Sequence, residues 1–174
     1  MIKEVSNWNV RSTNYSNNII DLKEIKSYLK IDSNYDDEYL QELVDSGIET
    51  AEKLTNLSLG IKEVSFNIDI SMPCIINLPV IPFLEIVKAY ITETRESIVD
   101  CIKLTHGATA LSVGEITNAN IMIVYKTGYD KKIPASIKQS ICSYISEVYE
   151  KNYVSGSLLN NIKNILSFYR EVKI

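Results

Sequence analysis

The residues best suited to bind a metal lie in one acidic segment, DSNYDDEYLQEL, at positions 32–43. Oxygen-bearing side chains stand at alternate positions from Asp32 to Asp36, as they do at the start of a calcium-binding loop. Such a loop also needs glycine at its sixth position and a bidentate glutamate at its twelfth, but Asp37 and Leu43 stand there. Helix capping explains the same acidic residues without a metal, so we predict no metal site in this segment.

Residues suited to nucleophilic or acid-base catalysis are sparse. The chain has one histidine, His106, and three cysteines, Cys74, Cys101 and Cys142. The glycine after His106 favours a β-turn over a base or a metal ligand. The wide spacing of the cysteines is typical of reduced thiols in a cytosol and not of a zinc site or a disulfide scaffold. A hydrolase that uses Cys142 and His106 stays an alternative, although no nucleophile signature surrounds Cys142.

Motifs for phosphate binding and for an exposed catalytic serine are also missing. The sequence contains no G-x-x-x-x-G-K-[ST], no G-x-G-x-x-G and no G-x-S-x-G. We expect the acidic residues Asp36, Asp37 and Glu38 to be solvated and not paired for acid-base work. We therefore predict a protein that is not an enzyme, with no catalytic residues and no cofactor. An enzyme of unfamiliar type would instead have a deep pocket around His106 or these acids, with perturbed pKa values.

The charge of the 174-residue chain is small in total but unevenly distributed. A net charge of -4 at pH 7 gives no general attraction to nucleic-acid phosphates. Residues 21–58 hold four basic and ten acidic residues, whereas residues 131–174 hold seven basic and three acidic ones. These opposite charges can pair within one molecule or between neighbouring copies in a head-to-tail assembly. Two solvated helical faces explain the same pattern, and all three interpretations stay open here.

The sequence predicts no membrane partner. Its longest apolar stretch, Cys74 to Val87, is interrupted by polar residues and prolines and falls short of the roughly 20 residues needed to span a bilayer. The first residues, MIKEVSNWNVRS, lack the apolar core and cleavage site of a secretory signal. We therefore expect the protein to stay in the cell that makes it.

Helical periodicity marks both ends of the chain. Apolar residues recur at helical spacing in four stretches, which are residues 22–29, 40–54, 137–148 and 158–169. Asp21 is a suitable N-cap for the first stretch. Gly47 lies on the apolar side of the second, where a missing side chain permits another helix to approach closely. We predict that the helices of the two ends pack together as a bundle.

Between these helices the apolar period changes to two. Alternation with polar residues predicts a half-buried strand that includes Val64, Phe66, Ile68 and Ile70. Further short strands are predicted at residues 74–78, 84–91, 98–104, 108–113 and 119–125. Their even spacing favours a small antiparallel β sandwich or barrel. The predicted fold is α+β, with residues 1–58 and 131–174 forming the helical bundle and residues 59–130 an inserted β subdomain.

Tyrosines are the most distinctive side chains of the C-terminal helices, where Tyr144, Tyr149, Tyr153 and Tyr169 occur. They are either core-edge residues with solvated hydroxyls or anchors in a subunit interface, and both interpretations stay open. Stacking on single-stranded nucleic acid would need interleaved basic residues on a sheet. Residues 59–130 hold five basic and eight acidic residues, which weakens that interpretation.

Five segments, taken in order, carry a family likeness. They are DLKEIKSYLKID, DDEYLQELVDSGIETAEKLTNLSL, NLPVIPFLEIVKAYI, VYKTGYDKKIPASIKQSICSYISEVYEKN and ILSFYR. Together they resemble the head-tail connector proteins, also called adaptor or DNA-packaging proteins, of long-tailed bacteriophages and gene transfer agents. The likeness covers most of the chain. One departure is that Ser140, Cys142 and the Lys151 to Tyr153 segment stand where the family often has an alanine-rich helix followed by an arginine.

The resemblance implies a structural virion protein that forms a homo-oligomeric ring, of twelve copies by family analogy, beneath the portal in the virion neck. Its implied partners are other copies of itself, the portal protein, head-completion or tail proteins, and DNA that passes through the lumen without sequence-specific contacts. Synthesis would occur in the cytoplasm of a bacterial host. A soluble α+β partner-binding module outside virions, monomeric or dimeric in solution, is the alternative.

Two sets of residues are candidates for the contacts of such a ring. The candidate portal-contact residues are Phe168, Tyr169, Arg170, Glu171, Val172, Lys173 and Ile174. This short amphipathic end cannot build a core of its own, although a frayed terminus is the alternative explanation. The candidate subunit-interface residues, which pair acidic with basic helices, are Asp36, Asp37, Glu38, Lys131, Lys132, Lys138 and Tyr149.

Overall fold

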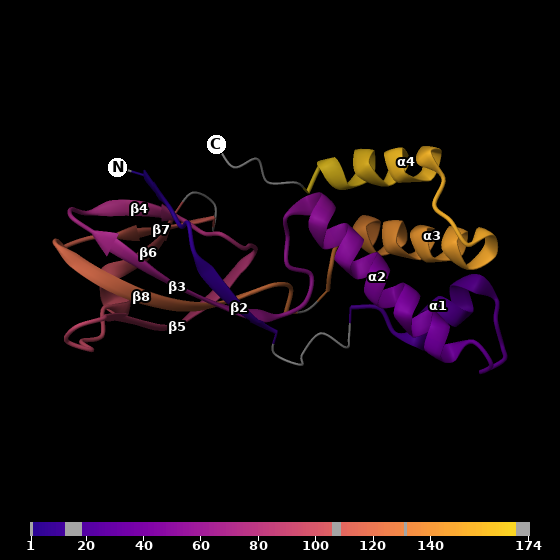
Figure 1. Cartoon of the computed structure of the whole chain (residues 1–174), viewed down its shortest axis with the longest axis horizontal. Coiled ribbons are helices and arrows are strands. Elements are labelled where there is room, and N and C mark those ends of the chain that lie inside the picture. Colours follow the sequence, from indigo (N-terminus) through magenta and orange to yellow (C-terminus); the bar gives the residue numbers. More distant parts are fainter. Residues whose placement is uncertain (1, 13–18, 106–108, 131, 170–174) are drawn as a thin grey trace. The chain divides into compact units, whose positions relative to one another are not determined.

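The computed structural model describes residues 2–12, 19–105, 109–130 and 132–169 (Figure 1). Contacts within the chain divide it into two compact units. One unit, here called the sheet unit, comprises residues 1–15 and 60–130. The other, here called the helical unit, comprises residues 16–59 and 131–174. The helical unit is thus assembled from two segments that are far apart in the sequence.

The sheet unit contains two sheets of four strands each. The first has the order β2-β3-β8-β5, with strands Trp8–Ser12, Lys62–Ile70, Ala119–Thr127 and Phe83–Ile91, all antiparallel. The second has the order β1-β4-β7-β6, with strands Ile2–Glu4, Cys74–Asn77, Ala110–Val113 and Ile102–Thr105. Strand β1 runs parallel to β4, and a 3-10 turn at Val99–Cys101 precedes β6.

Alternation along β3 and β8 builds the core of the first sheet. Val64 pairs with Tyr125 and Phe66 pairs with Ile123, and all four side chains are buried. Because successive side chains on a strand point to opposite faces, this register places one apolar face of both central strands in the core. The period of two in the sequence therefore predicted the buried face of β3 correctly.

Tyr125 ties the two sheets together from inside this core. Its ring stacks on Phe83, with 6.1 Å between ring centroids, and meets the ring of Phe66 edge-on at 6.2 Å. Its hydroxyl donates to the Val80 carbonyl oxygen at 2.7 Å and accepts from the Val80 N–H at 3.1 Å. Burial raises the pKa of Tyr125 well above its ordinary value. Val80 lies between β4 of one sheet and β5 of the other, so this side chain fixes their connection.

Gly128 brings the two ends of the 60–130 segment together. Its φ of 115° is accessible to glycine but strained for other residues. A Cβ atom at this position would lie 2.2 Å from the carbonyl oxygen of Gly60, so no side chain fits. The N–H of Gly128 donates to the Pro82 carbonyl oxygen at 2.9 Å. The chain consequently enters and leaves the sheet unit at neighbouring points.

The helical unit contains four helices, α1 at Leu22–Leu29, α2 at Asp37–Thr55, α3 at Ala135–Lys151 and α4 at Gly156–Ser167. Asp21 caps α1 by accepting a hydrogen bond from the Lys23 N–H, as its position in the sequence predicted. Both long helices end at asparagines in the left-handed conformation, Asn56 after α2 and Asn152 after α3. No described helix is long and apolar enough to cross a membrane.

Helices α2 and α3 approach each other closely at Gly47. A Cβ atom there would lie 2.9 Å from Ile141 Cγ2 and 3.4 Å from Tyr144 Cδ1 on α3. Both Gly47 and Ile141 are buried. Next to this contact, the Ser46 and Tyr144 hydroxyls form a hydrogen bond of 3.2 Å. The close approach predicted at Gly47 is therefore confirmed, and helices from both ends of the chain pack together.

The α+β class is confirmed, the barrel alternative and the wholly antiparallel arrangement are wrong, and two strands were not predicted. The described strands form two open sheets and no closed barrel. The pairing of β1 with β4 is parallel, so the β structure is not wholly antiparallel. Strands β1 and β2 were not predicted, because β1 has only three residues and the apolar alternation of β2 is limited to Trp8 and Val10. These strands also group residues 1–15 with the sheet unit and not with the helices. Independent folding of the predicted domains stays a prediction.

Replacing Tyr125 with phenylalanine removes both hydrogen bonds to Val80 and keeps the ring. We expect Tyr125→Phe to lower the free energy of unfolding by about 1 to 3 kcal/mol, because the backbone groups of Val80 lose a partner in the interior. Urea denaturation measures this change. Tyr90→Phe, on the edge strand β5 of the same sheet, serves as the control and should change stability by less than about 0.5 kcal/mol.

Replacing Gly47 with valine tests the packing of α2 on α3. Helix propensity alone favours the change slightly, but the added side chain collides with Ile141. We expect Gly47→Val to destabilise the protein by about 1 to 3 kcal/mol. Gly156→Val is the matched control, since a Cβ atom at Gly156 meets no atom within 4 Å. Equal denaturation midpoints for the two variants would contradict the close packing.

Candidate subunit interface

The acids predicted at a subunit interface hold the loop between α1 and α2 within their own subunit. Lys26 of α1 donates from Nζ to Asn34 Oδ1 at 2.6 Å and to Asp37 Oδ1 at 2.8 Å. Asp36 accepts a hydrogen bond of 2.8 Å from the Tyr149 hydroxyl on α3. The loop is therefore attached to α1 and α3 on either side of its tip. We call these five side chains the loop brace.

The hydrogen bond to Asp36 keeps the Tyr149 hydroxyl protonated. It raises the pKa of Tyr149, and desolvation raises it further, because an adjacent carboxylate disfavours a phenolate. The Tyr149 ring also lies beside the Tyr39 ring, with 6.2 Å between centroids. A phenol that stays protonated and keeps donating is suited to a structural contact and not to nucleophilic chemistry.

The remaining predicted interface residues are divided between internal pairs and exposed positions. Lys138 of α3 forms an ion pair of 2.6 Å with Glu24 of α1. Glu38 and Lys132 are exposed. Lys131 lies outside the described residues. Most of the predicted acidic and basic side chains that the structure describes therefore have partners inside the helical unit.

The predicted portal-contact residues begin where α4 ends. Phe168 is the C-cap residue of α4, and 89% of its surface is exposed. Tyr169 is half-buried, and its hydroxyl forms a hydrogen bond with the Ser136 hydroxyl on α3. Residues 170–174, Arg170 to Ile174, lie outside the described residues. The end of α4 is thus attached to α3 by Tyr169 while Phe168 faces solvent.

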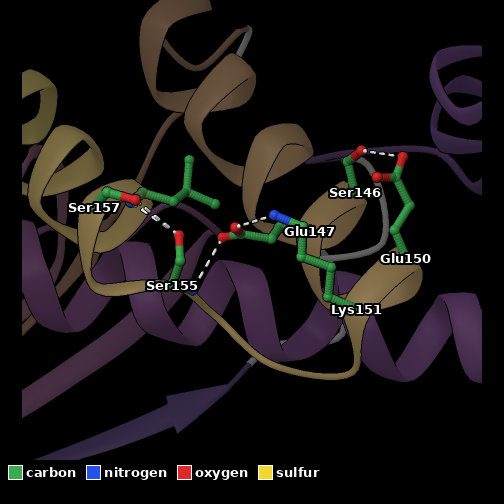
Figure 2. A network of polar contacts seen from close by, with 7 residues as sticks. Ser146, Glu147, Glu150, Lys151, Ser155 and Ser157 are labelled. Carbon is green, nitrogen blue, oxygen red and sulfur yellow. Dashed lines mark hydrogen bonds and ion pairs between the residues drawn. The ribbon is translucent and has the colours of Figure 1, made fainter.

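Sequence reasoning missed a polar network that fixes the turn between α3 and α4 (Figure 2). The Glu147 side chain is 11% exposed and accepts from Lys151 Nζ at 3.0 Å and from the Ser155 N–H at 3.1 Å. Ser155 in turn caps α4 by accepting from the Leu158 N–H. The hydrogen bonds from Ser155 and Lys151 lower the pKa of Glu147. Two features of the sequence could have indicated this network. One is the serine before an apolar helical stripe, and the other is the Glu-Lys pair at i,i+4 spacing.

The described residues show no assembled metal centre, and the candidate nucleophile Cys142 is buried. No group of three or more His, Cys, Asp and Glu side chains in the described ranges is placed to hold a metal ion. Residues 37–43 of the acidic segment form the first two turns of α2. Burial raises the pKa of Cys142, which disfavours its thiolate form. His106 lies outside the described residues, so its predicted turn is untested.

Part of the chain matches a known protein family in sequence, and nearly all of it matches known structures in fold. Residues 19–80 match the family model of the phage gp6-like head-tail connector proteins. No curated protein sequence matches the chain. Solved structures similar in fold include a neck of an empty gene transfer agent particle computed with C6 symmetry, with a TM-score of 0.74, 12% identity and coverage of 95% of this chain and 97% of that chain.

Chains of two further gene transfer agent structures also have a fold similar to that of this chain. A chain of the native virion gives a TM-score of 0.71 at 12% identity and covers 96% of each chain. A chain of the native neck computed with C12 symmetry gives 0.70 at 13% identity and covers 94% of each chain. At such low identities these likenesses establish a shared fold over nearly the whole chain.

The Glu147 network predicts a pH-dependent contribution to stability. Because the pKa of Glu147 is lowered in the folded state, its contribution is present above the ordinary carboxyl value of 4.5 and is lost as the pH falls through the lowered value. Glu147→Gln should therefore be less stable than the parent at about pH 7 and equally stable at strongly acidic pH. Urea denaturation across this pH range measures the difference in free energy of unfolding between the variant and the parent. Glu42→Gln, at an exposed position of α2, should show no such difference.

Proposed function

We propose that this chain, whose residues 19–80 match the family model of the phage gp6-like head-tail connector proteins, is a structural connector of the virion neck. The family consists of structural virion proteins and not of enzymes. The observation that carries the proposal is the agreement of two independent likenesses. One is the family match in sequence, and the other is the fold shared with gene transfer agent neck structures over 95% of this chain.

The connector is proposed to act as a homo-oligomeric ring. The neck structures of similar fold were computed with C6 and C12 symmetry, and a ring of twelve copies is compatible with both. A closed cyclic ring uses two different surfaces of each subunit, since every contact is head-to-tail. The net charge of -4 favours the passage of DNA through such a lumen without tight binding.

The portal protein is the proposed partner of the C-terminal segment, Phe168 to Ile174. Two features of the helical unit support this assignment. The exposed Phe168 offers an aromatic anchor. The hydrogen bond between the Tyr169 and Ser136 hydroxyls attaches the start of the segment to α3. The segment combines apolar and charged residues in seven positions, which suits insertion into a partner's surface.

Lateral contacts between copies are proposed to use Glu38 and Lys132, which are exposed, together with Lys131, which lies outside the described residues. The other members of the predicted interface set, Asp36, Asp37, Lys138 and Tyr149, support the interface from inside, because they hold α1, α2 and α3 in place. Head-completion or tail proteins would then assemble on the completed ring. A chain that stayed monomeric and never joined particles would instead be a soluble partner-binding module.

Deleting Arg170 to Ile174 tests the portal contact in particles. We expect the truncated subunit to keep its unfolding curve, because these residues follow the last turn of α4. We expect it to fail to join portal-bearing heads, which would then lose DNA or lack tails. The control replaces the same five residues with a Gly/Ser segment of equal length and should fail in the same way. Normal numbers of tailed particles from the truncated protein, counted by electron microscopy, would contradict the portal contact.

A further inference from the structure

The loop between α1 and α2 presents one aromatic side chain fully to solvent. Tyr35 is 93% exposed, the highest value among the large apolar and aromatic side chains of the described residues. Tyrosine is a frequent anchor at the centre of protein interfaces, because its ring buries a large area and its hydroxyl finds a polar partner. Exposure at a loop tip does not by itself make a residue an interface anchor. The contacts of the residues around Tyr35 are therefore needed to assign its role.

The loop brace fixes the residues on both sides of Tyr35. Asn34, directly before it, accepts from Lys26, and Asp36, directly after it, accepts from Tyr149. The Asp37 N–H also donates to the Asn34 carbonyl oxygen, which closes a turn around Tyr35. A side chain held in this way loses little backbone freedom when it binds, so the loop is preorganised for a partner.

Acidic residues surround this tip on the surface. Asp32 and Glu38, each three residues from Tyr35, are exposed. Tyr39, one turn into α2, is partly exposed and packs beside Tyr149. We call Tyr35, Tyr39, Asp32 and Glu38 the tyrosine tip. Its exposed groups offer hydrogen-bond acceptors and negative charge around an aromatic centre, so a complementary partner supplies donors and positive charge.

Helix α4 has the complementary chemistry on another side of the same unit. Its twelve residues include no acid, and its exposed residues include Asn160, Asn161, Asn164 and Lys163. Amide and ammonium groups are donors that suit carboxylates and a phenol oxygen. Ile165, also exposed, adds apolar surface that can cover an aromatic ring. In Figure 1, α4 and α1 lie on opposite sides of α3.

We infer that the tyrosine tip of one copy docks on the exposed face of α4 of the next copy. This inference rests on the ring proposed above. Tyr35 is the anchor of this contact, and Glu38 or Asp32 faces Lys163. A contact of two tyrosine tips would instead place acids against acids and close a dimer. The two dissimilar surfaces on opposite sides of α3 suit the head-to-tail contacts of a cyclic ring. The loop brace is thus the internal support of a lateral interface.

The test uses the full chain and measures both folding and ring assembly. Tyr35→Ala should leave the unfolding curve of the subunit unchanged, because the side chain is exposed. It should weaken ring assembly, followed by native mass spectrometry and sedimentation, by at least ~30-fold in concentration, the loss expected for an interface anchor. Met72→Ala is the matched control, since Met72 is 50% exposed and lies between β3 and β4 of the sheet unit.

Charge exchange and cross-linking identify the surface that Tyr35 meets. Glu38→Lys and Lys163→Glu should each weaken assembly, and the double variant should regain it. A photo-reactive phenylalanine analogue at position 35 should cross-link to peptides of α4 from another copy. Rings that form equally well with Tyr35→Ala, or cross-links to another neck protein, would overturn this contact and leave the ring intact. A parent chain that forms no ring, free or on portal-bearing heads, would overturn the proposed function itself.

Discussion

The helical unit depends on one close contact, that of Gly47 on α2 with Ile141 on α3. These helices come from opposite ends of the chain, and the whole 60–130 segment lies between them in the sequence. Because no side chain separates the helix backbones at Gly47, α2 and α3 keep the register that lets Ser46 bond to Tyr144 and Asp36 bond to Tyr149. The geometry of the α1–α2 loop, and so of the proposed interface, follows from that register.

The packing of the helices gives the unevenly distributed charges a role inside the subunit. Paired acids and bases mostly satisfy one another within the helical unit, as Asp37 does with Lys26 and Glu24 with Lys138. Charges that are partly shielded and paired this way hold a local geometry more effectively than they attract a distant partner. The side chains left for neighbouring copies are then exposed aromatics and unpaired charges at the edges of the unit. In the proposed ring, this division lowers the cost of assembly, because a subunit that is already ordered loses less freedom when it binds.

Much of the fold could be predicted because its signals are local. Apolar stripes predicted the four described helices, and alternation predicted β3, whereas β1 and β2, with three and five residues, are too short to give a clear signal. The partners of the predicted interface residues could not be predicted, since Tyr149 and Asp36 are 113 positions apart and meet only through the packing of α3 on α2. Tyr35 carried one weak signal, its place in a polar turn, but its brace depends on the same distant contacts. Resemblance to head-tail connectors supplied the function that no single motif indicated.

The proposed connector ring of the virion neck can be observed directly in particles. Cryo-electron microscopy of the neck in tailed particles produced from a genome that encodes this chain tests it most directly. We expect a ring of twelve copies between portal and tail, into whose density the four helices and two sheets of this fold can be placed. A neck in which another protein forms that ring, with this chain absent from purified particles, would contradict a connector role.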